Sequence, residues 1–258
     1  MLTLHRAEFL LPDPAEPTAP SFADGAVVVR GELVEAVGPY AELAAAHPSA
    51  RVRDWGRALL APGLRHPCGQ RLLERDYHPD PREEIGVEPV VDGLVGCTDE
   101  ARYGASARRG LQRMLGFGVT AVAGPFARAA VRTAVVRLGL VALPGAAGLS
   151  GAGGLSGAAG LSGAAGLSGA AGLSGAAGLA GAVEAAELSG AGEPGEGAGP
   201  LDPLAVLPLA RAVHGRVAAG GRADFAVFPV VAEEGGVRPA AGGCLATVLA
   251  GRLVYRRR

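Results

Sequence analysis

The sequence predicts an α/β fold, and three observations support this class. Strand-like runs rich in β-branched residues occur near both ends of the chain, for example at 26–30 and 223–228. Between them, residues 105–143 alternate helix, strand, helix, strand with short connections, which is typical of a parallel α/β layer. A low-complexity Gly/Ala/Leu/Ser segment then separates this layer from the C-terminal strands.

The N-terminal region predicts short strands and one short helix. The first two strands form a hairpin around Gly31-Glu32, and Gly38-Pro39 closes it. The strands are expected at 26–30, 33–37, 52–55 and 57–60, and the helix at 41–46. Residues 79–99 are rich in proline and acidic residues without a clear period, so they are expected to form a loop.

The middle region predicts two helix–strand units. Residues 105–115 place Leu111 and Met114 on one side and several arginines on the other, which indicates an amphipathic helix that ends at Gly116. A short buried strand at 119–122, a second helix at 127–138 and a second strand at 140–143 follow.

Residues 145–183 repeat the hexapeptide Leu-Ser-Gly-Ala-Ala-Gly and carry no charge. The leucine spacing does not fit an α-helix, and serine and glycine dilute the segment too far for a membrane span. Glycine recurs at every third position, as in collagen, but the segment has no proline. The composition favours a flexible linker. The alternative is a segment that drives assembly.

The C-terminal region predicts a helix at 204–213, a strand at 223–228 and a closing hairpin formed by 246–249 and 253–255. Three arginines at 256–258 end the sequence and are expected to be a solvated tail.

Composition excludes some classes of function. The net charge of -1 gives no electrostatic reason to expect nucleic acid or an anionic membrane as a partner. All 24 basic residues are arginine, so neither a Schiff base nor a carbamylated lysine can form. Cys68, Cys97 and Cys244 form no CxxC motif, and no signal peptide is expected at the N-terminus, so the sequence predicts a cytoplasmic protein with reduced thiols.

Two pairs of sequence strings then point to a known family. The N-terminal pair is DGAVVVRGELVEAVG at 24–38 and LLAPGL at 59–64; the C-terminal pair is GRVAAGGRADFAVF at 215–228 and TVLAGRLVY at 247–255. Together they resemble the small β-sandwich of the amidohydrolase superfamily, above all its imidazolonepropionase and aminodeoxyfutalosine deaminase-like members. The resemblance implies a composite sandwich built from both chain ends, with a metal-dependent (β/α)8 barrel between them. The segment 117–122 is similar to the second strand of that barrel.

This resemblance defines the expected organisation. Residues 1–63 and 201–258 are expected to form the two halves of the composite sandwich, the second half including a helix. Residues 64–144 are expected to form a partial βα barrel, and 145–200 a low-complexity linker. About 150 residues lie between Leu64 and Gly215, and about 40 of them are repeat. A closed barrel needs about 250 residues, so at most two or three βα units are expected.

The sequence departs from the family at the metal ligands. The family carries a His-x-His pair on the strand after Pro-Gly, and two imidazoles so spaced face the same way on a strand. Aligned from Pro62-Gly63, these positions are Cys68 and Gln70. His66 and Cys68 are therefore the weak metal candidates, as a same-face pair interrupted by Pro67.

The later ligands that the family implies are absent as well. No histidine lies between His78 and His214, and there is no lysine. The sequence thus identifies no catalytic and no cofactor-binding residue, and zinc or iron is expected only if the family chemistry is retained. Asp224 matches the family's Ala-Asp motif, where a structural role is expected.

Three hypotheses follow. The first is an amidohydrolase-like pseudoenzyme, catalytically degenerate because its metal ligands are missing. The second is an active hydrolase of non-peptide C–N bonds in cyclic amidines or aminopurine-like compounds. The third is a non-enzymatic assembly or binding module. An open barrel fragment exposes strand edges, so self-association or a protein partner covering it is also expected.

Overall fold

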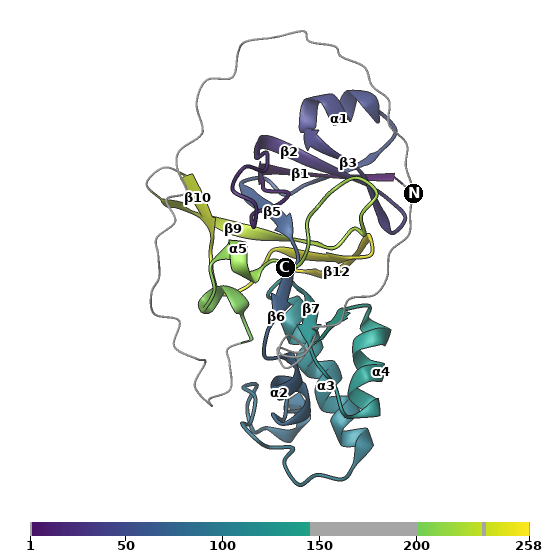
Figure 1. Cartoon of the computed structure of the whole chain (residues 1–258), viewed down its shortest axis with the longest axis vertical. Helices are drawn as coiled ribbons and strands as arrows, with labels where there is room; N and C mark the ends of the chain where they lie inside the picture. The colour runs from purple at the N-terminus through teal and green to yellow at the C-terminus, as the bar shows by residue number, and fades with distance from the viewer. Residues whose placement is uncertain (1, 145–200, 234–235, 258) are drawn as a thin grey trace, which may run out of the picture.

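Both ends of the chain contribute to one sheet in the computed structural model, which describes residues 2–144, 201–233 and 236–257 (Figure 1). The sheet has nine strands, and its main path runs β12-β11-β9-β5-β1-β2-β3. Strand β4 pairs with β1, and β10 pairs with β9 outside this path. The repeat at 145–183, expected to be a linker, lies outside the described residues.

The N-terminal half of this sheet is built from five strands and one helix. The strands are β1 (Leu2–Leu10), β2 (Phe22–Arg30), β3 (Leu33–Pro39), β4 (Arg51–Asp54) and β5 (Ala58–Pro62), and the helix is α1 (Tyr40–Ala46). The predicted hairpin is confirmed: β2 and β3 are antiparallel, with Val28 opposite Ala36. Gly31 turns the chain between them at a φ of 61°, a conformation that glycine adopts at little cost.

The C-terminal half adds four strands after two short helical segments. These elements are the 3₁₀ helix η3 (Pro203–Ala205), α5 (Leu209–Ala212), β9 (Phe225–Glu233), β10 (Gly236–Pro239), β11 (Ala246–Leu249) and β12 (Arg252–Arg256). Strands β11 and β12 form the predicted closing hairpin, with Leu249 opposite Arg252.

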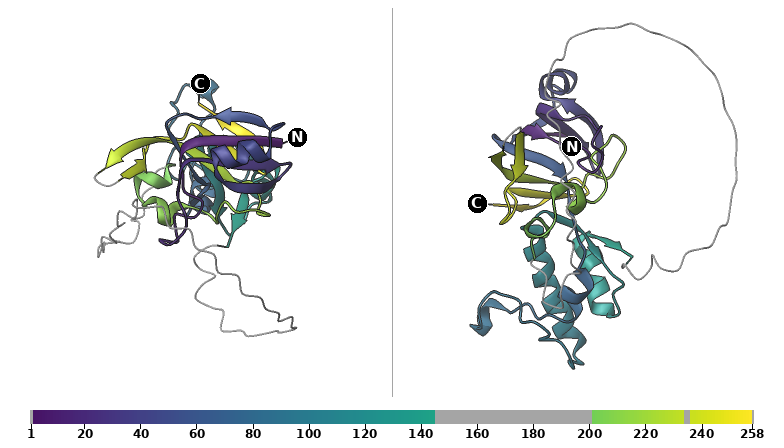
Figure 2. Two further views of the ribbon diagram at one scale, coloured as in Figure 1. Left: turned by 90° about the horizontal axis from the view of Figure 1, so that it is seen from above. Right: turned by 60° about the vertical axis from the view of Figure 1, so that its left-hand side comes forward.

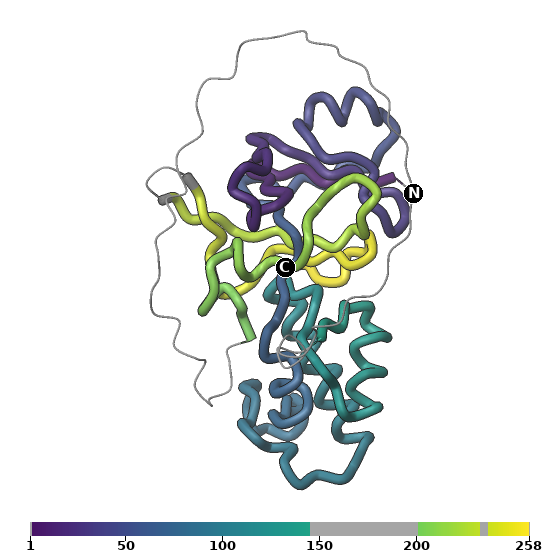
Figure 3. Tube along the Cα trace, viewed as in Figure 1, coloured from purple at the N-terminus to yellow at the C-terminus, as the bar shows by residue number. Residues whose placement is uncertain are grey.

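The two halves join where β5 pairs with β9 (Figure 3). The strands are antiparallel, and the paired residues run from Ala58 opposite Pro229 to Pro62 opposite Phe225. A second connection lies at the β2–β3 turn, where the Val34 N–H donates to the Gly221 carbonyl at 2.8 Å. Both chain ends therefore contribute to one composite sheet, where the sequence predicts a composite β-sandwich built from the same two ends.

A smaller parallel sheet follows directly from β5. Its order is β6-β7-β8, and helices connect the strands. The elements are β6 (Leu64–His66), α2 (Gly69–Glu74), the 3₁₀ helix η1 (Pro81–Glu83), α3 (Glu100–Leu115), β7 (Val119–Ala123), α4 (Ala129–Leu138) and β8 (Val141–Leu143). Figure 2 shows these helices and strands as a separate layer below the composite sheet. This arrangement is the predicted incomplete (β/α) barrel.

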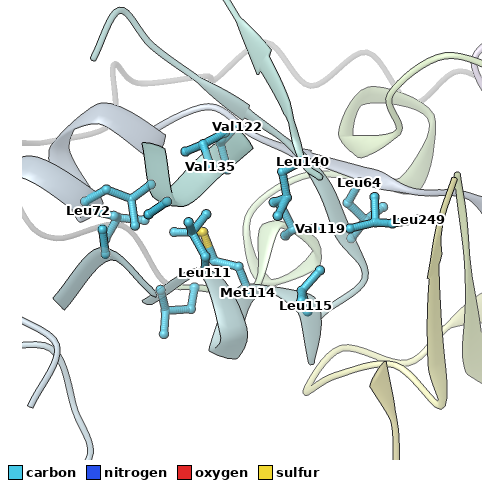
Figure 4. Packing of buried hydrophobic residues seen from close by; sticks show 14 of the residues in the cluster. Leu64, Leu72, Leu111, Met114, Leu115, Val119, Val122, Val135, Leu140 and Leu249 are labelled. Carbon is cyan, nitrogen blue, oxygen red and sulfur yellow. The ribbon is translucent and has the colours of Figure 1, made fainter. Parts of the chain in front are cut away.

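The core of the barrel fragment continues into the composite sheet. Leu72, Leu111 and Met114 are fully buried between α2 and α3, and Val122 and Val135 pack beside them (Figure 4). The same cluster includes Leu249 of β11. Thr247 also donates a hydrogen bond to the Leu115 carbonyl at 2.6 Å. Apolar packing and hydrogen bonds therefore join the two parts.

The structure corrects one predicted element and adds others, among them β1, α2 and β10. The helix expected at 204–213 is wrong: η3 and α5 are separate, and Pro208 stands at the N-cap of α5. Proline has no N–H to donate and clashes with the preceding turn, so a continuous helix cannot pass through it. Strand β1, for which the sequence reading gave no element, lies between β2 and β5 within the sheet.

Among the described residues, no helix is long and apolar enough to cross a membrane.

The imidazole of His5 in β1 should make stability depend on pH. Trp55 donates to its Nδ1 at 3.4 Å and the ring of Phe225 meets it edge-on. Burial, assisted by the charge of Arg53, lowers the pKa of His5 to about 3. Because this pKa lies below the unfolded value, the stability that neutral His5 contributes is present near pH 7 and lost as the pH falls below about 6.5.

We expect His5 to account for about 2 kcal/mol of stability lost between pH 7 and pH 5. Urea unfolding at both pH values should show that loss in the parent protein and a correspondingly smaller loss in His5→Gln. His47→Gln, which changes a half-buried ring after α1, is the matched control and should keep the parental slope. An equal slope in His5→Gln and the parent would contradict the assignment.

Candidate functional site

The positions that the family resemblance assigns to the first metal ligands lie where β6 ends. Strand β6 stops at His66, and Pro67 follows it. Cys68 is the N-cap of α2, and Gln70 is an exposed residue within that helix. Only a continuous strand would point alternate side chains the same way. The structure therefore does not place the aligned pair Cys68 and Gln70 on one strand face.

The two weak metal candidates, His66 and Cys68, are neighbours, but their contacts stabilise the fold and do not favour metal binding. His66 is buried, and the main-chain N–H of Cys68 donates to its Nδ1 at 3.3 Å. Burial raises the pKa of the half-buried Cys68 thiol, opposed by the charge of Arg71. A raised pKa disfavours the thiolate, which is the form that binds metals.

The remaining histidines are dispersed. His5 lies in β1. The main-chain N–H of His214 donates to the Gly63 carbonyl at 2.8 Å, which places this residue near the start of β6. His78 is packed beneath α3: its Nε2 lies 2.8 Å from the Leu72 carbonyl, and a Cβ on Gly110 would fall 2.5 Å from the same nitrogen. Burial lowers the pKa of His78 and so favours a neutral ring.

The side chains around His66 and Cys68 therefore do not provide enough suitable ligands for a metal ion. Within the described ranges, no three His, Cys, Asp or Glu side chains gather in a way that could hold an ion. Zinc sites use three or four protein ligands, and their histidines are neutral and their cysteines ionised. His66 and Cys68 supply at most two, and the second is held toward the thiol form.

The two most buried carboxylates near the C-terminal half hold the backbone in place. Asp224 immediately precedes β9, accepts from the Ala250 N–H at 2.7 Å and pairs with Arg222 at 3.1 Å. Asp202 accepts from the Leu204 N–H and from the Gly242 N–H. Sequence reasoning anticipated a structural role for Asp224 but did not single out Asp202, which shows no local motif.

All three cysteines are free. Cys244 is fully buried beneath the start of β11, where its thiol lies 3.5 Å from the Leu115 carbonyl. Burial raises the pKa of Cys244 to about 11. The group is therefore a packed thiol held in its neutral form, whereas a cysteine nucleophile needs the thiolate.

A cavity of about 590 Å³ lies elsewhere, beside the C-terminal end of α3. Its wall contains Arg109, Arg113, Phe117, Tyr255 and Arg257, none of which sequence reasoning proposed as a site. The sequence predicts a polar helix face for Arg109 and Arg113 and a solvated tail for Arg257. Only the fold brings these separated segments together.

Comparison with known families finds one match, in the N-terminal half of the composite sheet. Residues 25–50 match the family model of the imidazolonepropionase-like composite domain of bacteria. These residues cover most of β2 and all of β3 and α1. No curated protein matches the chain.

Three solved structures show partial overlaps with the chain. Guanine deaminase from Bradyrhizobium japonicum has a TM-score of 0.40 and 19% identity, over 55% of this chain and 34% of that one. An adenosine deaminase from Xanthomonas campestris with bound zinc has a TM-score of 0.39 and 22% identity, over 55% and 33%. Helicobacter pylori aminofutalosine deaminase has a TM-score of 0.38 and 14% identity, over 56% and 33%. The chain thus spans about a third of the length of these structures.

The fold is an α/β arrangement of a composite sheet and an incomplete barrel. More particularly, residues 25–50 within that sheet are similar to the imidazolonepropionase-like composite domain, the family that the sequence resembles.

Proposed function

We propose that the protein is a non-hydrolytic relative of the amidohydrolases, a pseudoenzyme that retains the composite sheet as a binding module. The observation that carries the proposal is the end of β6: Pro67 ends the strand, and the two aligned ligand positions fall at the start of α2. Two side chains in that arrangement do not present a common face to one ion.

The electrostatics support the same proposal. A metal bound by His66 and Cys68 would have to compete with the Cys68 N–H for Nδ1 or use Nε2, and would need the thiolate of a cysteine whose pKa is raised. The chain contains no lysine that could replace a missing histidine as a carbamylated bridge.

The open edge of the barrel fragment supports a binding role. Among the described strands, β8 pairs with β7 alone, and its Ala142 is exposed. An unpaired edge favours strand addition by another chain. We propose that a protein partner or a second copy of this chain covers it, in the cytoplasm, where free thiols persist.

Metal analysis tests the proposal directly. We expect the purified full-length protein to contain far less than one zinc or iron per chain by inductively coupled plasma mass spectrometry. It should not hydrolyse imidazolonepropionate or deaminate guanine, before or after incubation with either metal, because the ligand set for activating water is absent.

His66→Ala and Cys68→Ser are the informative variants, with His47→Ala as the control outside β6 and α2. The proposal fails if the parent holds about one metal per chain that His66→Ala or Cys68→Ser releases and His47→Ala does not. Metal-dependent turnover of either compound would favour the active hydrolase instead.

Deletion of residues 145–183 separates a linker from an assembly segment. We expect the full chain and the deleted chain to show the same oligomeric state by analytical ultracentrifugation, because the Gly/Ser-rich composition favours a flexible linker. Conversion of an oligomer to a monomer on deletion would instead favour a segment that drives assembly.

A further inference from the structure

The cavity of about 590 Å³ lies where three distant parts of the chain meet. One wall is the loop before and after η1, including Pro79 and Val87; a second is the last turns of α3; the third is the C-terminal strand β12. The junction is held by the Cys244 N–H, which donates to the Gly116 carbonyl at 2.9 Å. Its volume falls within the range of about 300–1,000 Å³ that is typical of small-molecule sites.

The cavity is at the opposite end of the parallel strands from His66 and Cys68. Gly116 and Phe117 line it and lie just before β7, separated from it by Gly118, whereas His66 is the last residue of the parallel strand β6. A ligand here would not touch the positions that the family resemblance assigns to metal ligands. The proposed loss of hydrolysis and binding at this cavity are therefore independent.

Two aromatic rings and two prolines give the cavity an apolar lining. Phe117 and Tyr255 are half-buried and come from α3's end and from β12. Tyr255 packs against Gly116, where an added Cβ would lie 3.5 Å from the ring. Aromatic side chains so held offer faces and edges to a planar ring in a ligand.

The guanidinium groups of Arg109, Arg113 and Arg257 differ in how many hydrogen bonds they already donate to the protein. Arg109 donates to the His78 carbonyl at 2.8 Å and also contacts Tyr77 and Asp80, so it is committed to the fold. Arg113 donates to the Val87 carbonyl and to the carboxylate of Glu88 at 3.3 Å.

Arg257 is the arginine most available to a ligand. Among the described residues, its side chain donates to the Gly242 carbonyl alone, at 3.0 Å. Its main-chain N–H donates to the Leu245 carbonyl at 2.9 Å, which fixes the backbone at this point. The Arg257 guanidinium thus keeps N–H groups that can donate hydrogen bonds to an anion.

The contact between Arg113 and Glu88 indicates which anion fits. It shows that a carboxylate reaches this guanidinium at the cavity wall. Glu88 is 83% exposed, and an ion pair so open to water contributes little to stability, so a ligand carboxylate can displace it at little cost. Arginine also pairs with carboxylates through two parallel hydrogen bonds.

From this geometry we propose that the cavity binds a planar aromatic carboxylate. The ring of the ligand lies between Phe117 and Tyr255, and its carboxylate accepts from Arg257 and, after displacement of Glu88, from Arg113. The arginines supply charge and orientation, and the apolar walls supply the burial that favours an aromatic body over a free inorganic anion.

Binding of 2-naphthoate to the full-length protein tests the proposal by isothermal titration calorimetry. We expect saturable binding, and about tenfold weaker binding in Arg257→Gln, because a charged hydrogen-bond donor is lost. Tyr255→Phe should retain affinity because the ring remains. Arg252→Gln changes an exposed arginine at the start of β12, outside this cavity; it is the matched control and should bind as the parent does.

Two further ligands isolate the chemistry. 2-Naphthamide keeps the rings without the charge, and inorganic phosphate keeps a charge without the rings; both should bind at least about tenfold more weakly than 2-naphthoate. Equal binding of the amide, absence of saturable 2-naphthoate binding, or equal effects of Arg257→Gln and Arg252→Gln would overturn the proposal. Thermal unfolding of each variant shows whether its fold is intact. If Arg257→Gln proves unstable, the comparison of 2-naphthoate with 2-naphthamide on the parent protein still tests the role of the carboxylate.

Discussion

The antiparallel pairing of β5 with β9 is the interaction on which the rest of the structure depends. It joins the two ends of the chain in one sheet, with Leu60 opposite Val227. Because β5 runs through Gly63 into β6, the same pairing also sets the position of the small parallel sheet. Gly63 has no space for a side chain: a Cβ there would lie 2.1 Å from the Thr120 side chain. Close packing at this junction therefore requires glycine.

The pairing that builds this framework involves neither of the positions aligned with the family's metal ligands. The β5–β9 pairs and the hydrogen bond from Thr247 to Leu115 include neither Cys68 nor Gln70, although Cys68 packs against the shared core around Met114. The ligands can thus be absent while the sheet and its core persist. The proposed loss of hydrolysis is therefore compatible with an intact composite sheet, because a fold and the site that it carries can change separately.

Local patterns predicted the parts of the fold that local interactions determine. The β-branched run at 26–30 gave the hairpin, and the apolar stripe of Leu111 and Met114 gave α3, although this helix begins earlier, at Glu100, with Asp99 as its N-cap. The helix at 204–213 failed because the break at Pro208 outweighed a favourable composition. The cavity residues could not be predicted from the sequence. Arg113 and Tyr255 are far apart along the chain, and they line the same cavity only after the two sheets have packed.

Hydrogen–deuterium exchange of the full-length protein tests the central claim most directly. If both chain ends form one cooperative sheet, peptides covering 58–62 and 225–229 should exchange together, among the slowest in the protein, and much more slowly than the exposed loop at 85–93. If one of these two strands exchanged as fast as that loop while the other stayed protected, the chain ends would not form one sheet and the account would be wrong.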